Sequence, residues 1–333
     1  MRCGVAGRAT PVKPAPSQPT VAAGLRLGSD PADVTSPTSP APAPRRSCLS
    51  VPGSSAAMLA KAPSRGADEI VIDLEDAVAI SAKDEARETV VAALAEPQWR
   101  DVRTSVRVNA PRTPWCHLDI MALASLPDAP ETIVVPKVES PDDMAFVERL
   151  LDGAEAAAER STPIGVQALI ENAAGVAHVT AIAGSSPRLV TLILGYADLS
   201  ASLGRARGAG ADLDSWRAIQ DAVLVAARTH DIAAIDGPYL GVEVDEGFRA
   251  ATERARDMGF DGKWAIHPRQ VAALNELFTP TDDEIKQARA FVAALEEAER
   301  EGGRGAVAVA GQMLDEAVRI AALRVLARAA STR

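Results

Sequence analysis

The feature that most constrains the fold is a repeated alternation along the chain. From residue 46 onward, short apolar or β-branched runs ending in glycine, proline or a charge alternate with alanine-rich stretches typical of helices. Eight such runs occur, at residues 47–53, 69–78, 102–110, 132–140, 163–172, 189–198, 231–241 and 262–270. Strands that alternate with helices predict a parallel sheet covered by helices. The sequence therefore predicts an α/β fold.

The number of repeats favours a closed barrel over an open sheet. Eight β/α units over roughly 225 residues are typical of a (β/α)8 TIM barrel. An open, doubly wound sheet is the alternative, and its dinucleotide-binding form needs Gly-x-Gly-x-x-Gly in the first strand-to-helix turn. The corresponding segment, residues 52–58, reads PGSSAAM. We therefore predict a TIM barrel with an appended C-terminal helical lid region.

Composition divides the chain into three parts. Residues 1–45 are rich in Pro, Ala, Ser and Thr, and such a segment buries too little surface to offset its ordering entropy. We expect a disordered tail there, without the apolar core of a secretory signal. Residues 46–278 are predicted to form the barrel. Residues 279–333, where two helical patterns flank a glycine-rich segment, are predicted to form a helical extension.

Charge and cysteine content exclude several classes of partner. The net charge is −10 and aromatic residues make up only 3%, so no basic or stacking surface for nucleic acid is expected. No stretch approaches the roughly 18 apolar residues that cross a bilayer, so no membrane partner is expected. Cys3, Cys48 and Cys116 lack C-x-x-C spacing. This argues against disulfides or a zinc–thiolate site and favours the reducing cytoplasm.

Polar side chains follow almost every predicted strand. In a (β/α)8 barrel the carboxyl ends of the strands form the face that holds the active site. The residues at these ends are, in chain order, Asp73, Glu75 and Asp76, then Arg107 and Asn109, Lys137 and Glu139, Glu171, Asp198, Asp236 and His267. The first three are carboxylates crowded into four positions, which costs free energy unless a cation or hydrogen-bond donors relieve it.

Two of these carboxylates indicate a metal site. Glu171 and Asp198 each follow a nearly continuous apolar run, where an unpaired carboxylate is costly. Oxygen ligands without a neighbouring cysteine or histidine suit Mg²⁺, and Arg107 could hold a substrate carboxylate or carbonyl. A metal and an arginine together stabilise negative charge that develops on oxygen. The alternative is that both carboxylates cap helices or pair with Lys and Arg.

Other candidates have structural alternatives. Lys137 could form a Schiff base, but a metal makes imine chemistry unnecessary, and a solvated or phosphate-contacting role is favoured. His267 shows no metal-ligand spacing to the other histidines and is interpreted as a structural or cofactor-adjacent group. Asp236 is interpreted first as a turn former beside Gly237 and Pro238.

The chain resembles a known family. The segments RSCLSVPGS, GADEIVIDLEDAV, SVRVNA, VVPKVES, ALIENAAGV, LGYADLSASLG, GFDGKWAIHPRQV and GQMLD occur in the order found in the HpcH/HpaI aldolase and citrate lyase superfamily. Within it, the chain is most similar to proteins like the citrate lyase beta subunit and malyl-CoA lyase. The resemblance covers about residues 46–318 and implies a (β/α)8 barrel that binds Mg²⁺ and cleaves or forms a carbon–carbon bond.

The resemblance also implies roles for individual residues. Glu171 and Asp198 match the family's metal ligands, and Glu171 and Lys137 are also assigned to substrate binding. Arg107 matches an arginine that contacts the substrate's carboxylate or oxo group. Glu75 and Asp76 match an acidic pair near the metal's water ligands. Asp315, in GQMLD, matches an aspartate that family trimers insert into a neighbouring subunit's site.

The implied function is that of a Mg-dependent carbon–carbon lyase acting on a 3-hydroxyacyl-CoA thioester of the malyl-CoA or citramalyl-CoA class. Alternatives are a CoA-independent 4-hydroxy-2-oxo-acid aldolase and a catalytically weakened binding subunit. The partners implied are an acyl-CoA or a small 2-oxo acid and further copies of the chain in a trimer or hexamer. Citrate lyase alpha and gamma subunits are partners that the family allows and that one chain does not indicate.

Several positions depart from the family pattern. Asn172 and Ala174 replace a threonine and an arginine, and Ala197 replaces a carboxylate beside the second metal ligand. Ser54 stands where the family often has an arginine placed for a CoA phosphate. Lys61 and Arg65 follow nearby and could replace it. These departures leave the choice between a CoA thioester and a free acid open.

Overall fold

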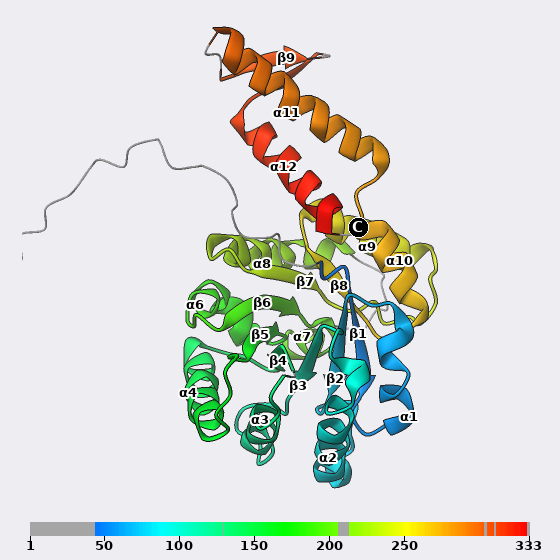
Figure 1. The fold of residues 1–333 in the computed structure, drawn as a ribbon, viewed down its shortest axis with the longest axis vertical. Coiled ribbons are helices and arrows are strands. Elements are labelled where there is room, and N and C mark those ends of the chain that lie inside the picture. Colours follow the sequence, from blue (N-terminus) through cyan, green and yellow to red (C-terminus); the bar gives the residue numbers. More distant parts are fainter. Residues whose placement is uncertain (1–43, 129, 206–212, 303–304, 310, 332–333) are drawn as a thin grey trace, which may run out of the picture. The chain divides into compact units, whose positions relative to one another are not determined.

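The computed structural model describes residues 44–128, 130–205, 213–302, 305–309 and 311–331. The tail expected at residues 1–45 therefore lies outside the described residues except for Pro44 and Arg45. Eight parallel strands pair in sequence order and close into a barrel, with β1 beside β8 (Figure 1). The strands are β1 (Ser47–Pro52), β2 (Glu69–Asp73), β3 (Thr104–Arg107), β4 (Thr132–Val135), β5 (Gly165–Ile170), β6 (Leu189–Leu194), β7 (Ala233–Asp236) and β8 (Gly262–Ala265). The predicted (β/α)8 barrel is confirmed.

Helices surround this barrel. They are α1 (Ala56–Leu59), α2 (Lys83–Leu94), α3 (Cys116–Ala124), α4 (Pro141–Ala157), α5 (Ala173–Ala177), α6 (Val179–Ala183), α7 (Tyr196–Ser202), α8 (Arg217–Thr229), α9 (Glu246–Met258) and α10 (Arg269–Phe278). Short 3-10 turns occur at Ala62–Arg65, Ile80–Ala82, Pro97–Trp99 and Leu213–Trp216. Helix α4 begins at a clear start signal: Ser140 is its N-cap and forms a capping box with Asp143, and Pro141 is its first residue.

Each strand lies within its predicted run but is shorter than that run. In most runs the residues left out include polar ones that follow the strand. On β2, for example, the strand ends at Asp73, and the next two carboxylates lie in the loop. The polar exits are thus either the last residues of strands, as Asp73 and Arg107 are, or residues that follow directly after a strand, where barrel active sites lie.

The barrel interior is layered because alternate residues of a strand share a face. A middle layer of apolar side chains forms one buried cluster, made of Cys48, Val71, Val134, Leu169, Ile193, Ile235 and Trp264. Two residues before Val71, Glu69 accepts hydrogen bonds from Ser105 and Gln167 at 2.7 and 2.5 Å. Two residues after Val71 lies Asp73. The apolar layer therefore separates two buried polar groups, one at each end of the barrel.

The described fold begins before residue 46. Arg45 is largely buried, and its Nε lies 3.4 Å from Glu69 Oε2. Its Nη1 donates to Thr191 Oγ1 at 2.6 Å. Arg45 thus compensates the buried Glu69 carboxylate at the amino-terminal end of the barrel, where a lone charge would be costly.

After the barrel, the chain forms two helices joined by a hairpin. These are α11 (Asp282–Gly302), the strands β9 (Val307–Val309) and β10 (Gln312–Leu314), and α12 (Glu316–Ser331). Both helices were predicted, whereas the antiparallel β9–β10 pair was not. Gly311 turns the hairpin with a φ of +82°, a conformation that glycine adopts without strain. The function of this region as a lid stays a prediction.

Within the described ranges, none of the helices has the length and apolar content needed to cross a membrane.

Candidate active site

An arginine–aspartate pair lies at the carboxyl ends of β2 and β3. Asp73 and Arg107 are neighbours in the strand register. Arg107 donates from Nε to Asp73 Oδ1 at 2.8 Å and from Nη2 to Oδ2 at 2.6 Å, a bidentate geometry. Burial alone would raise the pKa of Asp73, but the guanidinium and two backbone amides hold it below its ordinary value. Arg107 is therefore a cation held in place at this face. Its Cζ lies 5.8 Å from the centroid of the Trp264 ring.

The two remaining carboxylates of the β2 exit face cationic side chains. Glu75 Oε1 lies 2.5 Å from Lys137 Nζ, and Glu75 Oε2 lies 3.2 Å from Arg107 Nη1. Asp76 is more exposed and lies farther from the same two cations, at 3.5 and 3.7 Å. Burial raises the pKa of Glu75 in spite of these cations. Arg107 and Lys137 thus relieve much of the repulsion within the DLED segment.

Lys137 occupies a strained position after β4. Its φ of +54° lies in the left-handed region, which is uncommon for residues other than glycine. Although burial opposes the charge, contact with Glu75 raises the pKa of Lys137 above its ordinary value. The amine is therefore protonated at neutral pH, which disfavours its use as a Schiff-base nucleophile.

Glu171 differs from the other carboxylates because it lacks a cationic partner. Its side chain is buried, with 4% of the residue exposed, and among the described residues it forms no ion pair. Its Oε1 accepts a hydrogen bond from the backbone N–H of Lys137 at 2.8 Å. Burial, together with the nearby Glu75 and Asp198 charges, raises the pKa of Glu171 to about 8. A cation bound here would remove this cost.

Glu171 is packed against a glycine that no other residue could replace without movement. A Cβ added to Gly195 would lie 2.6 Å from Glu171 Cβ and 2.8 Å from its Oε2. Gly195 is the N-cap residue of α7, whose first turn carries Asp198. The close approach therefore brings the helix bearing one expected ligand against the other expected ligand.

Asp198 contacts the same ammonium group as the acidic loop of β2, that of Lys137. Its Oδ2 is 3.3 Å from Lys137 Nζ, and the Asp198 side chain is 37% exposed. Lys137 therefore joins both expected ligands, through its backbone amide to Glu171 and through its ammonium to Asp198. The alternative of pairing with Lys is thus realised for Asp198 and not for Glu171.

These residues fit a magnesium ion. In the described part of the chain, no three His, Cys, Asp or Glu side chains form a complete metal cage. Mg²⁺ does not need one, since it commonly takes one or two protein carboxylates and completes its shell with water and substrate. The uncompensated charge of Glu171, its contact with Gly195 and the exposure of Asp198 match this pattern.

Other predicted residues have structural partners. The buried Asn109 donates to Asp119 Oδ2 from its backbone and side-chain nitrogens, at 2.9 and 2.7 Å. Asp236 is buried and pairs with Lys263 of β8, so it is more than a turn former. His267 Nδ1 accepts from the backbone N–H of Arg269 at 3.2 Å, in agreement with a structural role.

Asp315 lies away from these contacts in a single chain. It is exposed, and its Oδ1 accepts from the backbone N–H of Val318 at 3.1 Å, in the first turn of α12. Its predicted insertion into a neighbouring subunit's site is not tested by a single chain.

Sequence reasoning did not assign roles to Asp73, Gly195 or Trp264 in this site. Asp73 could have been paired with Arg107, because both occupy the last inward position of adjacent strands. The role of Gly195 depends on a backbone approach that spacing does not reveal. Trp264 packs in the apolar layer of the barrel, and its ring also faces Arg107.

Comparison with known proteins agrees with the geometry. The family model described as HpcH/HpaI aldolase/citrate lyase matches residues 46–268. An L-malyl-CoA/beta-methylmalyl-CoA lyase of Rhodobacter capsulatus is 41% identical over 295 residues, which is 83% of this chain and 92% of that protein. The citrate lyase subunit beta of Escherichia coli (strain K12) is 37% identical over 287 residues, covering 86% of this chain and 93% of the relative.

A solved structure supports the same relationship. The CitE protein of Mycobacterium tuberculosis, in complex with magnesium, acetoacetate and coenzyme A, is 32% identical and aligns with a TM-score of 0.71. The alignment covers 86% of this chain and 98% of that one. Together with the barrel and the placement of its acidic residues, these matches show that the chain belongs to the HpcH/HpaI aldolase/citrate lyase family.

Proposed function

We propose that this chain is a Mg-dependent carbon–carbon lyase that cleaves or forms a 3-hydroxyacyl-CoA thioester of the malyl-CoA or citramalyl-CoA class. The observation that carries the proposal is that Glu171 is buried and forms no ion pair among the described residues. The charges of Asp198 and Arg107 are nevertheless close enough to affect the pKa of Glu171. The names of the relatives support the substrate class, since one is a malyl-CoA lyase and a solved relative binds magnesium and coenzyme A.

In this proposal Glu171 and Asp198 hold the magnesium ion, which when bound supplies a Lewis acid for substrate oxygens. Arg107 orients the carboxylate or oxo end of the substrate. Asp73 takes the Nε and Nη2 donors of the guanidinium, and the remaining Nη1 faces Glu75 and Asp76. Lys137 adds a second positive charge at the same face, and its ammonium is suited to bind an anionic substrate group.

Cleavage breaks the carbon–carbon bond next to the hydroxyl carbon. The hydroxyl loses its proton as the oxo acid forms, and the enolate left on the thioester must gain one. We assign the proton transfers to the carboxyl groups of this site, Glu75 and Asp76, and to Asp315 of a neighbouring copy. The raised pKa of Glu75 supports its use as an acid–base group, because it brings the pKa closer to neutral pH.

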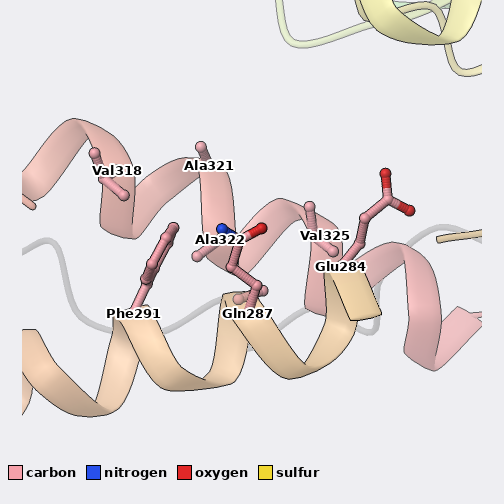
Figure 2. A pocket seen from close by; sticks show the side chains of 8 residues that line it. Glu284, Gln287, Phe291, Val318, Ala321, Ala322 and Val325 are labelled. Atoms are coloured by element: carbon pink, nitrogen blue, oxygen red, sulfur yellow. The ribbon is translucent and has the colours of Figure 1, made fainter. Parts of the chain in front are cut away.

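The contribution of Asp315 requires an oligomer, and we propose a homotrimer or homohexamer. Support comes from the apolar surface of the two C-terminal helices, α11 and α12. Figure 2 shows Phe291 of α11 pointing toward Val318 and Ala321 of α12, where the two helices enclose a groove with a mainly apolar lining. On α12, outside the lining of this groove, Ile320 and Leu323 are each 44% exposed, which leaves apolar surface for a neighbouring chain to cover.

We further propose a cytoplasmic location. Cys48 and Cys116 are both buried and free, which fits a reducing compartment.

Incubation of the chain with malyl-CoA and Mg²⁺ tests the function. Release of glyoxylate, followed as its phenylhydrazone, together with acetyl-CoA supports the proposal, and EDTA should abolish the activity. Glu155→Gln serves as a control, because it changes a buried glutamate of α4 that pairs with Arg188 outside this site, and it should retain activity. Cleavage only of free 4-hydroxy-2-oxo acids would replace the thioester lyase by the aldolase alternative. No cleavage of either substrate class, with metal bound, would favour a binding subunit.

A further inference from the structure

A largely buried polar cluster includes the first residue of α7, the helix that carries Asp198. It consists of Tyr196, Gln220, Asp236 and Lys263, contributed by α7, α8, β7 and β8. Asp236 and Lys263 are paired in the strand register, and their side chains form an ion pair. With 1% and 2% exposure they are among the most buried charged residues of the described chain. The lyase chemistry proposed above uses neither of them.

Tyr196 joins this cluster to the site. Its hydroxyl donates to Asp236 Oδ1 and accepts from Gln220 Nε2 at 2.8 Å. The Lys263 ammonium lies 5.9 Å from the centre of its ring. On another side, Trp216 meets the Tyr196 ring edge to face, with centroids 5.0 Å apart. The Tyr196 side chain is therefore fixed by hydrogen bonds at its hydroxyl and by contacts of its ring with Lys263 and Trp216.

The backbone around the cluster is shaped to admit this ring. A Cβ on Gly237, directly after Asp236, would lie 2.7 Å from Tyr196 Cδ2 and 2.3 Å from the carbonyl oxygen of Leu194. Glycine at 237 thus lets the tyrosine approach β7. With Gly195 against Glu171, glycines permit close packing on both sides of the α7 start.

Helix α7 needs such an anchor. It has only seven residues, and its N-cap, Gly195, provides no side-chain hydrogen bond. Helices this short are not stable alone, so tertiary contacts determine where α7 lies. Tyr196 is its first residue and Asp198 its third. A displacement of Tyr196 therefore displaces Asp198 relative to Glu171.

We propose that Tyr196, fixed by Asp236, Gln220 and Lys263, is a positioning residue that sets the placement of Asp198 toward Glu171 for binding a divalent cation. This inference rests on the proposed metal site, and it adds a function for four residues outside that site. Its consequence is that removing one hydroxyl, whose hydrogen bonds go to Asp236 and Gln220 and to neither expected ligand, weakens metal binding.

Tyr196→Phe is the direct test, because it removes the hydroxyl and keeps the ring. Mn²⁺ binding is measured by electron paramagnetic resonance of the free ion, without substrate and well below the unfolding temperature. We expect the Kd for Mn²⁺ to rise about tenfold, the lower end of the range for groups that orient metal ligands. Gln220→Met, which removes only one donor to the hydroxyl, should raise the Kd by a smaller factor.

Ser105→Ala is the matched control. It removes a buried hydroxyl that donates to the buried Glu69 carboxylate at the other end of the barrel. It should lower the unfolding temperature and leave the Kd for Mn²⁺ unchanged. An unchanged Kd in both Tyr196→Phe and Gln220→Met, with wild-type protein binding Mn²⁺, would overturn the positioning role alone. An equal rise in Ser105→Ala would also overturn it, because binding would then follow general stability. Failure of the wild type to bind Mn²⁺ would overturn the metal site itself and this inference with it.

Discussion

Glu171 makes the metal-free protein less stable than it could be. Its pKa is raised to about 8 in the folded state, from an ordinary value of 4.5. Because the folded state holds this proton more tightly, the contribution of Glu171 to stability is fully present below pH 4.5 and is lost as the pH rises toward 8. We therefore predict that Glu171→Gln stabilises the metal-free protein. Glutamine has the same shape and can still accept from the Lys137 amide.

The magnitude follows from the two pKa values. At about 1.4 kcal/mol per pH unit, the interval from 4.5 to 8 corresponds to roughly 5 kcal/mol when Glu171 is fully ionised, as at pH 9. At pH 7 only about 2.5 units of the interval have been crossed, so the expected gain is roughly 3 kcal/mol. Below pH 4.5 the gain should vanish. This trend with pH is specific to removal of a buried charge.

Urea unfolding in EDTA at pH 7 and pH 9 measures this gain. Added Mg²⁺ should stabilise the wild type by mass action and leave Glu171→Gln unchanged, since the variant lacks a ligand. Glu155→Gln is the control, because Glu155 is equally buried but accepts from Arg188 at 2.6 Å and from the amide of Ile164. The free energy of unfolding of the Glu155→Gln variant should fall by about 1–3 kcal/mol. A Glu171→Gln variant that is less stable than the wild type in EDTA at pH 9 would refute the reasoning.

Three further predictions concern residues around the ligand pair. Gly195→Ala should weaken Mn²⁺ binding by tenfold or more, since the added Cβ would lie 2.6 Å from Cβ of Glu171. Gly153→Ala is the control and should bind Mn²⁺ normally, because an added Cβ there meets no atom within 4 Å. Arg107→Lys should lower kcat/KM about 100-fold in the thioester assay, because lysine cannot keep the fork to Asp73 and bind substrate; a loss below threefold would contradict this. Lys137→Met should tighten Mn²⁺ binding several-fold while raising KM, because the ammonium 3.3 Å from a ligand repels a dication. Weaker Mn²⁺ binding in that variant would show that the lysine supports the metal.

The architecture could be predicted because it depends on periodicity. Eight apolar runs separated by helical segments leave few arrangements, and the position of Glu171 directly after a buried run places it at the barrel face. Not every charge pair could be predicted in the same way. Asp73 and Arg107 end adjacent strands, so their pair follows from strand order. Lys137, in contrast, contacts three carboxylates from a backbone with a left-handed φ, which the sequence does not reveal.

Two further features were missed for identifiable reasons. The β9–β10 hairpin lies in a glycine-rich stretch whose strands are only three residues long, too short for an alternating pattern to be recognised. Tyr196 is a single aromatic residue before a short helix, and its partners come from α8, β7 and β8. Contacts between residues so far apart in the chain follow from the closed barrel and not from local spacing.

Crystals grown with Mn²⁺ in place of Mg²⁺ provide the most direct measurement. Anomalous scattering locates manganese independently of the protein atoms. The account predicts one peak about 2.0–2.2 Å from a carboxylate oxygen of Glu171 and from one of Asp198, with water in the remaining positions. A peak that contacts neither carboxylate, or no peak at millimolar Mn²⁺, would contradict the claim that these two residues hold the metal.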